Sequence, residues 1–159
     1  MKSSFLLLSF AVILLVACQS GQEKGHEGHH GHGETDKPLT LADSLYQDVM
    51  DAHDAVMPKI GKVRGAQKRV QQILDSINAL PGKAQKANQD LKTTLEKLVS
   101  ELNYADFAMD KWMTEFNLDS GANNPDVRVK YLTDEKMKVT KVKEAIINSL
   151  AKADTLLKK

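Results

Sequence analysis

Methionine and histidine side chains that could bind a soft metal ion recur at helical spacing near residue 50. In "VMDAHDAVMP", residues 49–58, Met50, His53 and Met57 are three and four positions apart and would share one stripe of a helix. Thioether sulfur and neutral imidazole nitrogen favour soft ions such as Cu(I), for which Ag(I) is a close analogue. The same spacing also suits ordinary core packing, because methionine fills irregular gaps between helices.

Three helices are expected to position these side chains. From Thr40 onward, apolar residues recur every three or four positions over residues 40–79, 84–116 and 126–157, and no strand pattern interrupts them. Turn residues separate the three segments at "LPGK" and "NLDSGANNPD". The second segment keeps a period near 3.5, which is typical of coiled-coil packing. The sequence therefore predicts an all-α fold, an up-down-up antiparallel three-helix bundle over residues 40–159.

Several residues indicate local features of the first helix. Thr40 is expected to be its N-cap, with Asp43 three residues later completing a weak capping box. Pro58 is expected to kink the helix. Gly61 and Gly65 form a GxxxG pattern in a charged segment, which predicts a close helix contact or a bend rather than a membrane dimer.

The helix lengths predict that one end of the bundle collects the residues with metal-binding chemistry. A turn near residue 82 sets position 53 level with about position 111, and a turn near 121 sets position 137 level with about 105. The predicted cluster provides thioethers, one imidazole and one indole, whose face can attract a cation. Packing of the bundle end remains the alternative. The candidate ligands and their neighbour are Met50, His53, Met57, Met109, Trp112, Met113 and Met137.

The N-terminus has the pattern of a secretory signal. Lys2 precedes the apolar run "FLLLSFAVILLVA", and "LVAC", which ends at Cys18, resembles a bacterial lipobox. We expect a signal peptide over residues 1–17 and lipidation of Cys18 with palmitate-type acyl chains, which would anchor the chain to a membrane. The following Gln19 is typical of outer-membrane lipoproteins that face the periplasm. An uncleaved anchor or a coincidental cysteine is the alternative.

Residues 18–39 form a second candidate metal-binding segment. The stretch is rich in glycine, histidine and charge, and it has too few apolar residues to offset its ordering entropy. We expect a flexible tether whose imidazoles bind Cu(II), Ni(II) or Zn(II) with modest selectivity. A solvated tether that is merely rich in histidine is the alternative. The four histidines concerned are His26, His29, His30 and His32.

The lipobox and three further motifs together resemble one family. "HDAVMP", "AMDKWM" and "KVKEAIINSLAKA" are similar to segments of small Bacteroidota lipoproteins loosely labelled viral A-type inclusion proteins. The resemblance covers most of residues 41–157. It implies a secreted helical protein and carries over no established biochemical activity.

The charge balance and the motifs exclude several function classes. The chain has 22 basic and 21 acidic residues, and this near-zero net charge gives no reason to expect nucleic acid as a partner. No nucleophile elbow and no Glu-x-x-His motif of a carboxylate di-metal site is present, so we do not expect an enzyme. We expect a lipid-anchored protein that handles copper, with Cu(I) in the bundle. The alternative is a metal-free helical scaffold or interaction module of the cell envelope with an unknown protein partner.

Overall fold

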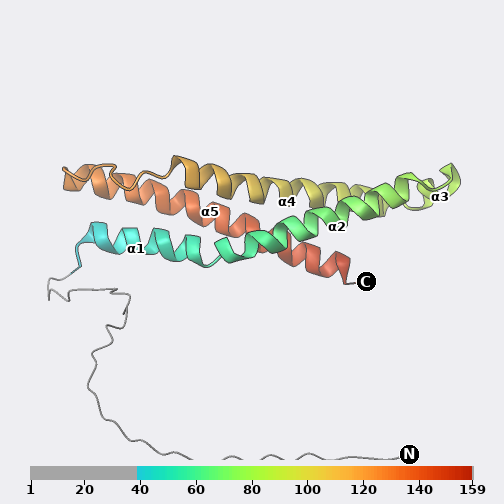
Figure 1. Ribbon diagram of the computed structural model, residues 1–159, viewed down its shortest axis with the longest axis horizontal. Helices are drawn as coiled ribbons and strands as arrows, with labels where there is room; N and C mark the ends of the chain where they lie inside the picture. Colours follow the sequence, from blue (N-terminus) through green and yellow to red (C-terminus); the bar gives the residue numbers. More distant parts are fainter. Residues whose placement is uncertain (1–38, 159) are drawn as a thin grey trace, which may run out of the picture. The chain divides into compact units, whose positions relative to one another are not determined.

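The computed structural model describes residues 39–158, and these residues are helical and contain no strand. The predicted all-α class is therefore confirmed. The predicted signal peptide, Cys18 and the four tail histidines lie outside the described residues. Over the described range, no helix combines the length and apolar character needed to cross a bilayer. The elements in order are α1 Leu41–Asp54, η1 Met57–Lys59, α2 Ile60–Asn78, α3 Gly82–Ala87, α4 Gln89–Glu115 and α5 Pro125–Leu157 (Figure 1).

The start of α1 follows the predicted capping box. The backbone N–H of Asp43 donates to Thr40 Oγ1 at 3.1 Å, and the backbone N–H of Thr40 donates to Asp43 Oδ2 at 3.0 Å. Two backbone donors that a helix terminus leaves without partners are satisfied in this way. The capping prediction is confirmed, and it fixes where the helix that carries Met50 and His53 begins.

The first predicted helix is divided rather than merely kinked. α1 ends at Asp54, the one-turn 3₁₀ helix η1 contains Pro58, and α2 begins at Ile60. Proline has no backbone N–H, and its ring clashes with the carbonyl one turn earlier, so it disfavours a continuous α-helix here. Lys59 Nζ donates to the carbonyl oxygen of Ala55 at 2.7 Å. This hydrogen bond satisfies a backbone carbonyl at the C-terminal end of α1.

The close helix contact expected at Gly61 and Gly65 is wrong. A Cβ atom at either position would meet nothing within 4 Å, so no other helix approaches closely there. α2 is also uninterrupted from Ile60 to Asn78. Both glycines are solvent-exposed and lie on the outer face of α2.

The chain reverses between α2 and α4 through the short helix α3. The amide nitrogen of Gln85 donates to the carbonyl oxygens of Asn78 at 2.9 Å and of Leu80 at 2.7 Å, which satisfies the end of α2. The predicted second helix, which was expected to run from residue 84, is interrupted at Asn88 between α3 and α4. We call α2, α3 and the first half of α4, up to Leu98, the hairpin end.

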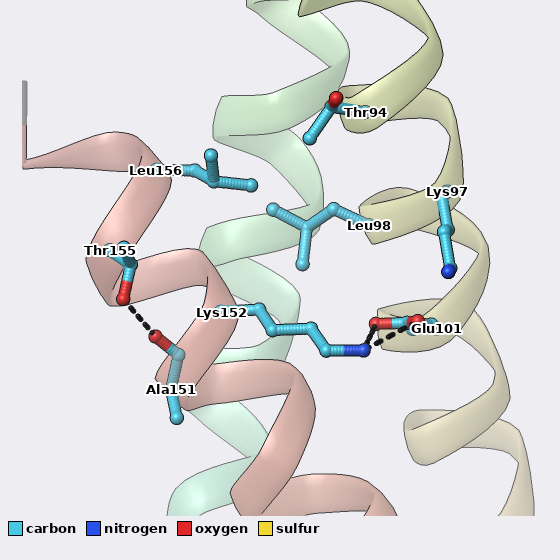
Figure 2. Close-up of a pocket in the computed structure, with 8 residues that line it drawn as sticks. All are labelled: Thr94, Lys97, Leu98, Glu101, Ala151, Lys152, Thr155 and Leu156. Atoms are coloured by element: carbon cyan, nitrogen blue, oxygen red, sulfur yellow. Dashed lines mark hydrogen bonds and ion pairs between the residues drawn. The ribbon is translucent and has the colours of Figure 1, made fainter.

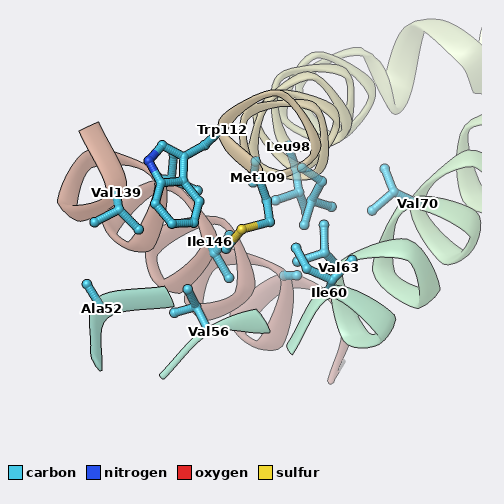
Figure 3. Close-up of a cluster of buried hydrophobic side chains, with 14 of the residues drawn as sticks. Ala52, Val56, Ile60, Val63, Val70, Leu98, Met109, Trp112, Val139 and Ile146 are labelled. Carbon is cyan, nitrogen blue, oxygen red and sulfur yellow. The ribbon is translucent and has the colours of Figure 1, made fainter. Parts of the chain in front are cut away.

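The core lies between α5 and the other long helices. α1 packs chiefly against α5, α2 packs against α4, and α4 packs against α5. Figure 3 shows Met109 and Trp112 projecting from α4 into this core, near Val139 and Ile146 of α5. The polar interruption in the repeat of α2 is also explained, because Gln67 Nε2 donates to the carbonyl oxygen of Leu102 at 3.2 Å. The predicted apolar repeats therefore mark the buried face of each long helix.

Arg128 organises the loop between α4 and α5. Its guanidinium donates to the carbonyl oxygens of Leu118 at 2.7 Å and of Ser120 at 3.0 Å. Gly121 has φ +72°, and a Cβ there would lie 2.6 Å from the backbone nitrogen of Arg128. Only glycine avoids both the strain and the clash, so the loop can close tightly on α5. Asn124 caps α5 by accepting from the backbone N–H of Asp126 at 3.1 Å.

Candidate metal-binding site

A shallow pocket of roughly 300 Å³ lies where α1 meets the end of α4. α1 supplies two of the predicted ligands, Met50 and His53, and α4 supplies Met113 and Trp112. The pocket therefore brings together four of the seven residues predicted from the sequence. We call it the thioether pocket, and its lining residues are Tyr46, Met50, His53, Trp112, Met113, Phe116 and Leu118.

One ring nitrogen of His53 is paired with a carboxylate. Its Nδ1 atom lies 2.7 Å from Asp54 Oδ1, and 17% of its side chain is exposed. In the tautomer that carries the proton on Nδ1, this nitrogen donates to the carboxylate and leaves the Nε2 lone pair free. Metal-binding histidines commonly have their second ring nitrogen fixed by a carboxylate in this way. The arrangement therefore fits a ligand role for Nε2.

Three rings that line the pocket belong to one stack, which continues to Tyr131. The ring centroid of Trp112 lies 5.5 Å from that of His53 and 5.0 Å from that of Phe116, and Phe116 lies 6.1 Å from Tyr131. Such offset and tilted pairs contribute about 0.5–1.5 kcal/mol each beyond the area that they bury. Because Trp112 is only 6% exposed, its ring is a wall of the pocket and does not cap it from solvent.

A buried polar contact behind Trp112 was missed by the sequence analysis. Trp112 Nε1 donates to Glu135 Oε2 at 2.9 Å, and Lys138 Nζ donates to Glu135 Oε1 at 2.7 Å. The hydrogen bond to Glu135 raises the pKa of Lys138 above its ordinary value. A signal was present in the sequence, since Glu135 occupies the position of the apolar repeat between Leu132 and Val139.

Three predicted ligands do not line the thioether pocket. Met109 is fully buried in the core, as its place in the seam of α4 requires. Met57 starts η1 and is 37% exposed, because the break at Pro58 turns the chain away from the line of α1. Met137 is 55% exposed and borders a separate groove with Leu45 and Lys136. The turn positions predict how far along the bundle each methionine lies. They do not predict which face of its helix the methionine occupies.

The donor set of the pocket is soft and uncharged. Met50 and Met113 offer thioether sulfur and His53 offers imidazole nitrogen, a combination suited to Cu(I) and Ag(I) and poorly suited to Mg²⁺ or Ca²⁺. In the part of the chain that the structure describes, no three His, Cys, Asp or Glu side chains gather to hold a metal ion. Any ion bound at this site would therefore depend on the methionines.

Comparison of the chain with protein-family models, with curated proteins and with solved structures finds no match. The geometry of the pocket therefore supplies the argument for function.

Proposed function

We propose that this protein binds one soft monovalent metal ion, Cu(I) in the cell, in the thioether pocket. The ligands are Met50, His53 and Met113, and Trp112 forms the adjoining wall. The observation that carries the proposal is the meeting of two thioethers with an imidazole whose Nδ1 is already held by Asp54 at 2.7 Å. A ligand set of this kind favours Cu(I) over Zn(II), because thioethers are soft and carry no charge.

The wider proposal is a lipid-anchored envelope protein that takes part in copper handling. Lipidation of Cys18 would hold the chain at the outer membrane, facing the periplasm, and the tail histidines His26, His29, His30 and His32 would capture Cu(II), Ni(II) or Zn(II). The apolar run that ends in the lipobox-like "LVAC" supports the secreted location. We infer that the helical part works as an up-down-up bundle in which α1 and α2 together form the first rod.

Silver titration tests the site directly. The full chain, with the four tail histidines changed to alanine and purified in detergent, is titrated with Ag(I) in chloride-free buffer. We expect about one Ag(I) per chain and a fall in emission from Trp112, which is the only tryptophan. Met50→Leu combined with Met113→Leu keeps the side-chain volume and should weaken binding by about tenfold or more, equivalent to about 1.4 kcal/mol.

Met137→Leu is the matched control, because Met137 is an exposed methionine outside the pocket. Its affinity for Ag(I) should equal that of the parent chain. Equal loss in the control and in the pocket variant, or unchanged Trp112 emission with no heat of binding, would refute the site.

The open groove between α4 and α5 supports the alternative of a metal-free interaction module. The groove has a volume of about 470 Å³, an apolar floor that includes Leu98 and Leu156, and an ion pair between Lys152 and Glu101 on its side (Figure 2). Grooves of this kind can accept an amphipathic helix of a partner. A failed silver titration would leave this alternative as the better account of the protein.

A further inference from the structure

Glu135 is the one charged side chain that is buried among residues 39–158, with 3% of its surface exposed. In the apolar repeat of α5, Glu135 occupies the buried position between Leu132 and Val139. Burying a carboxylate costs free energy unless its oxygens are paired. Its position behind Trp112, one wall of the thioether pocket, suggests a specific use for the charge.

Each oxygen of Glu135 has a different partner. Oε2 accepts from Trp112 Nε1 inside the core, and Oε1 accepts from Lys138 Nζ near the surface. The side chain of Lys138 is 58% exposed, so water screens its ammonium group. The carboxylate is therefore neutralised only in part, and its other side faces the indole.

The lining of the thioether pocket contains no carboxylate of its own. Both of its N–H donors instead bond a carboxylate placed behind them: His53 pairs with Asp54, and Trp112 pairs with Glu135. Asp54 is 69% exposed and is screened by solvent, whereas Glu135 is buried and acts through a low-dielectric environment. Arg128 is a positive group beside the lining, and its guanidinium carbon lies 6.0 Å from the ring centroid of Tyr46.

We propose that Glu135 is a positioning residue that makes the thioether pocket favour a cation. It fixes the plane of the indole through Nε1, and its charge makes the face of the Trp112 ring more negative toward the ion. The inference rests on the proposed function, because it assigns a counter-charge to the same metal ion. Thioether and neutral imidazole ligands carry no charge, so they do not neutralise the positive charge of a bound ion. The negative charge of the Glu135 carboxylate offsets part of it.

Two substitutions with opposite expected signs test this role. Glu135→Gln keeps an oxygen that can accept from Trp112 Nε1 but removes the charge, and the affinity for Ag(I) should fall about fivefold. Lys138→Gln removes the exposed counter-ion of Glu135, and the affinity should rise about twofold. A merely structural role would weaken binding in both variants. Measurements use the full chain at pH 7.5 with the tail histidines replaced, and helicity is recorded beside each titration.

Glu101→Gln is the matched control. Glu101 also accepts from a lysine, Lys152 at 2.7 Å, but it borders the groove between α4 and α5 and not the thioether pocket. Its affinity for Ag(I) should match that of the parent.

The outcomes separate the two proposals. A parent chain that fails to bind Ag(I) overturns the proposed function and, with it, the role of Glu135. A parent chain that binds, with unchanged affinity in Glu135→Gln and in Lys138→Gln, overturns the inference alone. If Glu135→Gln does not fold, the sign of the Lys138→Gln effect decides, and weaker or equal binding there refutes the inference.

Discussion

The hairpin end and the end that holds the thioether pocket bury their side chains with different chemistry. At the hairpin end, the buried residues are aliphatic and come from α2 and α4: Ile60, Val63, Val70, Leu74, Ile77, Leu95 and Leu98. At the pocket end, aromatic rings stack at 5.0–6.1 Å, and a buried carboxylate bonds an indole. Aliphatic packing stabilises without fixing one geometry, whereas paired polar groups tolerate only one arrangement. The pocket end therefore has the more narrowly specified structure, as a binding site requires.

The largest expected effect concerns the hairpin end. Leu95 is 1% exposed, and Leu95→Ala should lower the free energy of unfolding by about 3 kcal/mol through lost burial and the cavity left behind. Leu91→Ala, one turn earlier at a site that is 44% exposed, should cost less than about 1 kcal/mol. Urea unfolding measures both values. Equal losses in the two variants would mean that the hairpin end is not stabilised by burial at Leu95.

At the pocket end, Trp112→Phe should cost about 2 kcal/mol, chiefly because it leaves the buried Glu135 without its indole donor. Removing the carboxylate as well, in Trp112→Phe with Glu135→Leu, should recover part of that loss, since no unpaired buried group remains. Urea unfolding of both variants gives the comparison. A double variant no more stable than the single one would show that packing volume, and not the polar pair, dominates here.

A smaller effect is expected at the start of α1. Thr40→Ala removes the cap and should cost about 1 kcal/mol, with the loss of order confined to the first turns of α1. Ser44→Ala, at an exposed position inside the same helix, should be close to neutral. Thermal melting gives the size of the effect, and backbone chemical shifts locate it. Shifts that spread to the hairpin end would contradict the local character of the cap.

The smallest effect is a pH dependence of the same cap. Hydrogen bonds from the Thr40 side chain, and then from its backbone, hold the pKa of Asp43 below its ordinary value of 3.8. Because the folded pKa lies below the unfolded one, the stabilisation is complete above about pH 4 and is lost as pH falls through the folded pKa. The first turn of α1 should therefore loosen in acid, as read from its chemical shifts. Thr40→Ala removes the side-chain hydrogen bond, which is the larger cause, and keeps the backbone N–H, so the transition should be weaker there. A transition of unchanged size in Thr40→Ala would assign it to another carboxylate.

The sequence predicts the long helices well because their burial is periodic. The seam from Leu95 to Trp112 and the capping box at Thr40 follow from spacing and local hydrogen bonding alone. The break at Pro58 was expected only as a kink, because sequence spacing does not show how far the chain turns. Interruption of the second helix at Asn88 depends on how the tight reversal closes, which no single residue signals.

The candidate site was only partly predictable. Met50, His53, Trp112 and Met113 line one pocket where α1 lies beside the end of α4, at the end of the bundle that the helix lengths indicated. Met137 could not be placed, because the register of α5 depends on the loop that Arg128 closes. Glu135 was passed over because a charged residue in a helix normally faces water, and only its partner Trp112 makes burial tolerable.

The break at η1 separates α1, which supplies one side of the thioether pocket, from the continuous helix α2. Tyr46, Met50 and His53 belong to α1, which rests on α5 and is joined to α2 only through the short 3₁₀ turn. Local opening of such a segment costs less than global unfolding, and amide hydrogen exchange detects it. Each detachment of α1 would dismantle the pocket, so an occupied pocket must slow it. The exchange rates of the α1 amides would thus report whether the pocket is occupied.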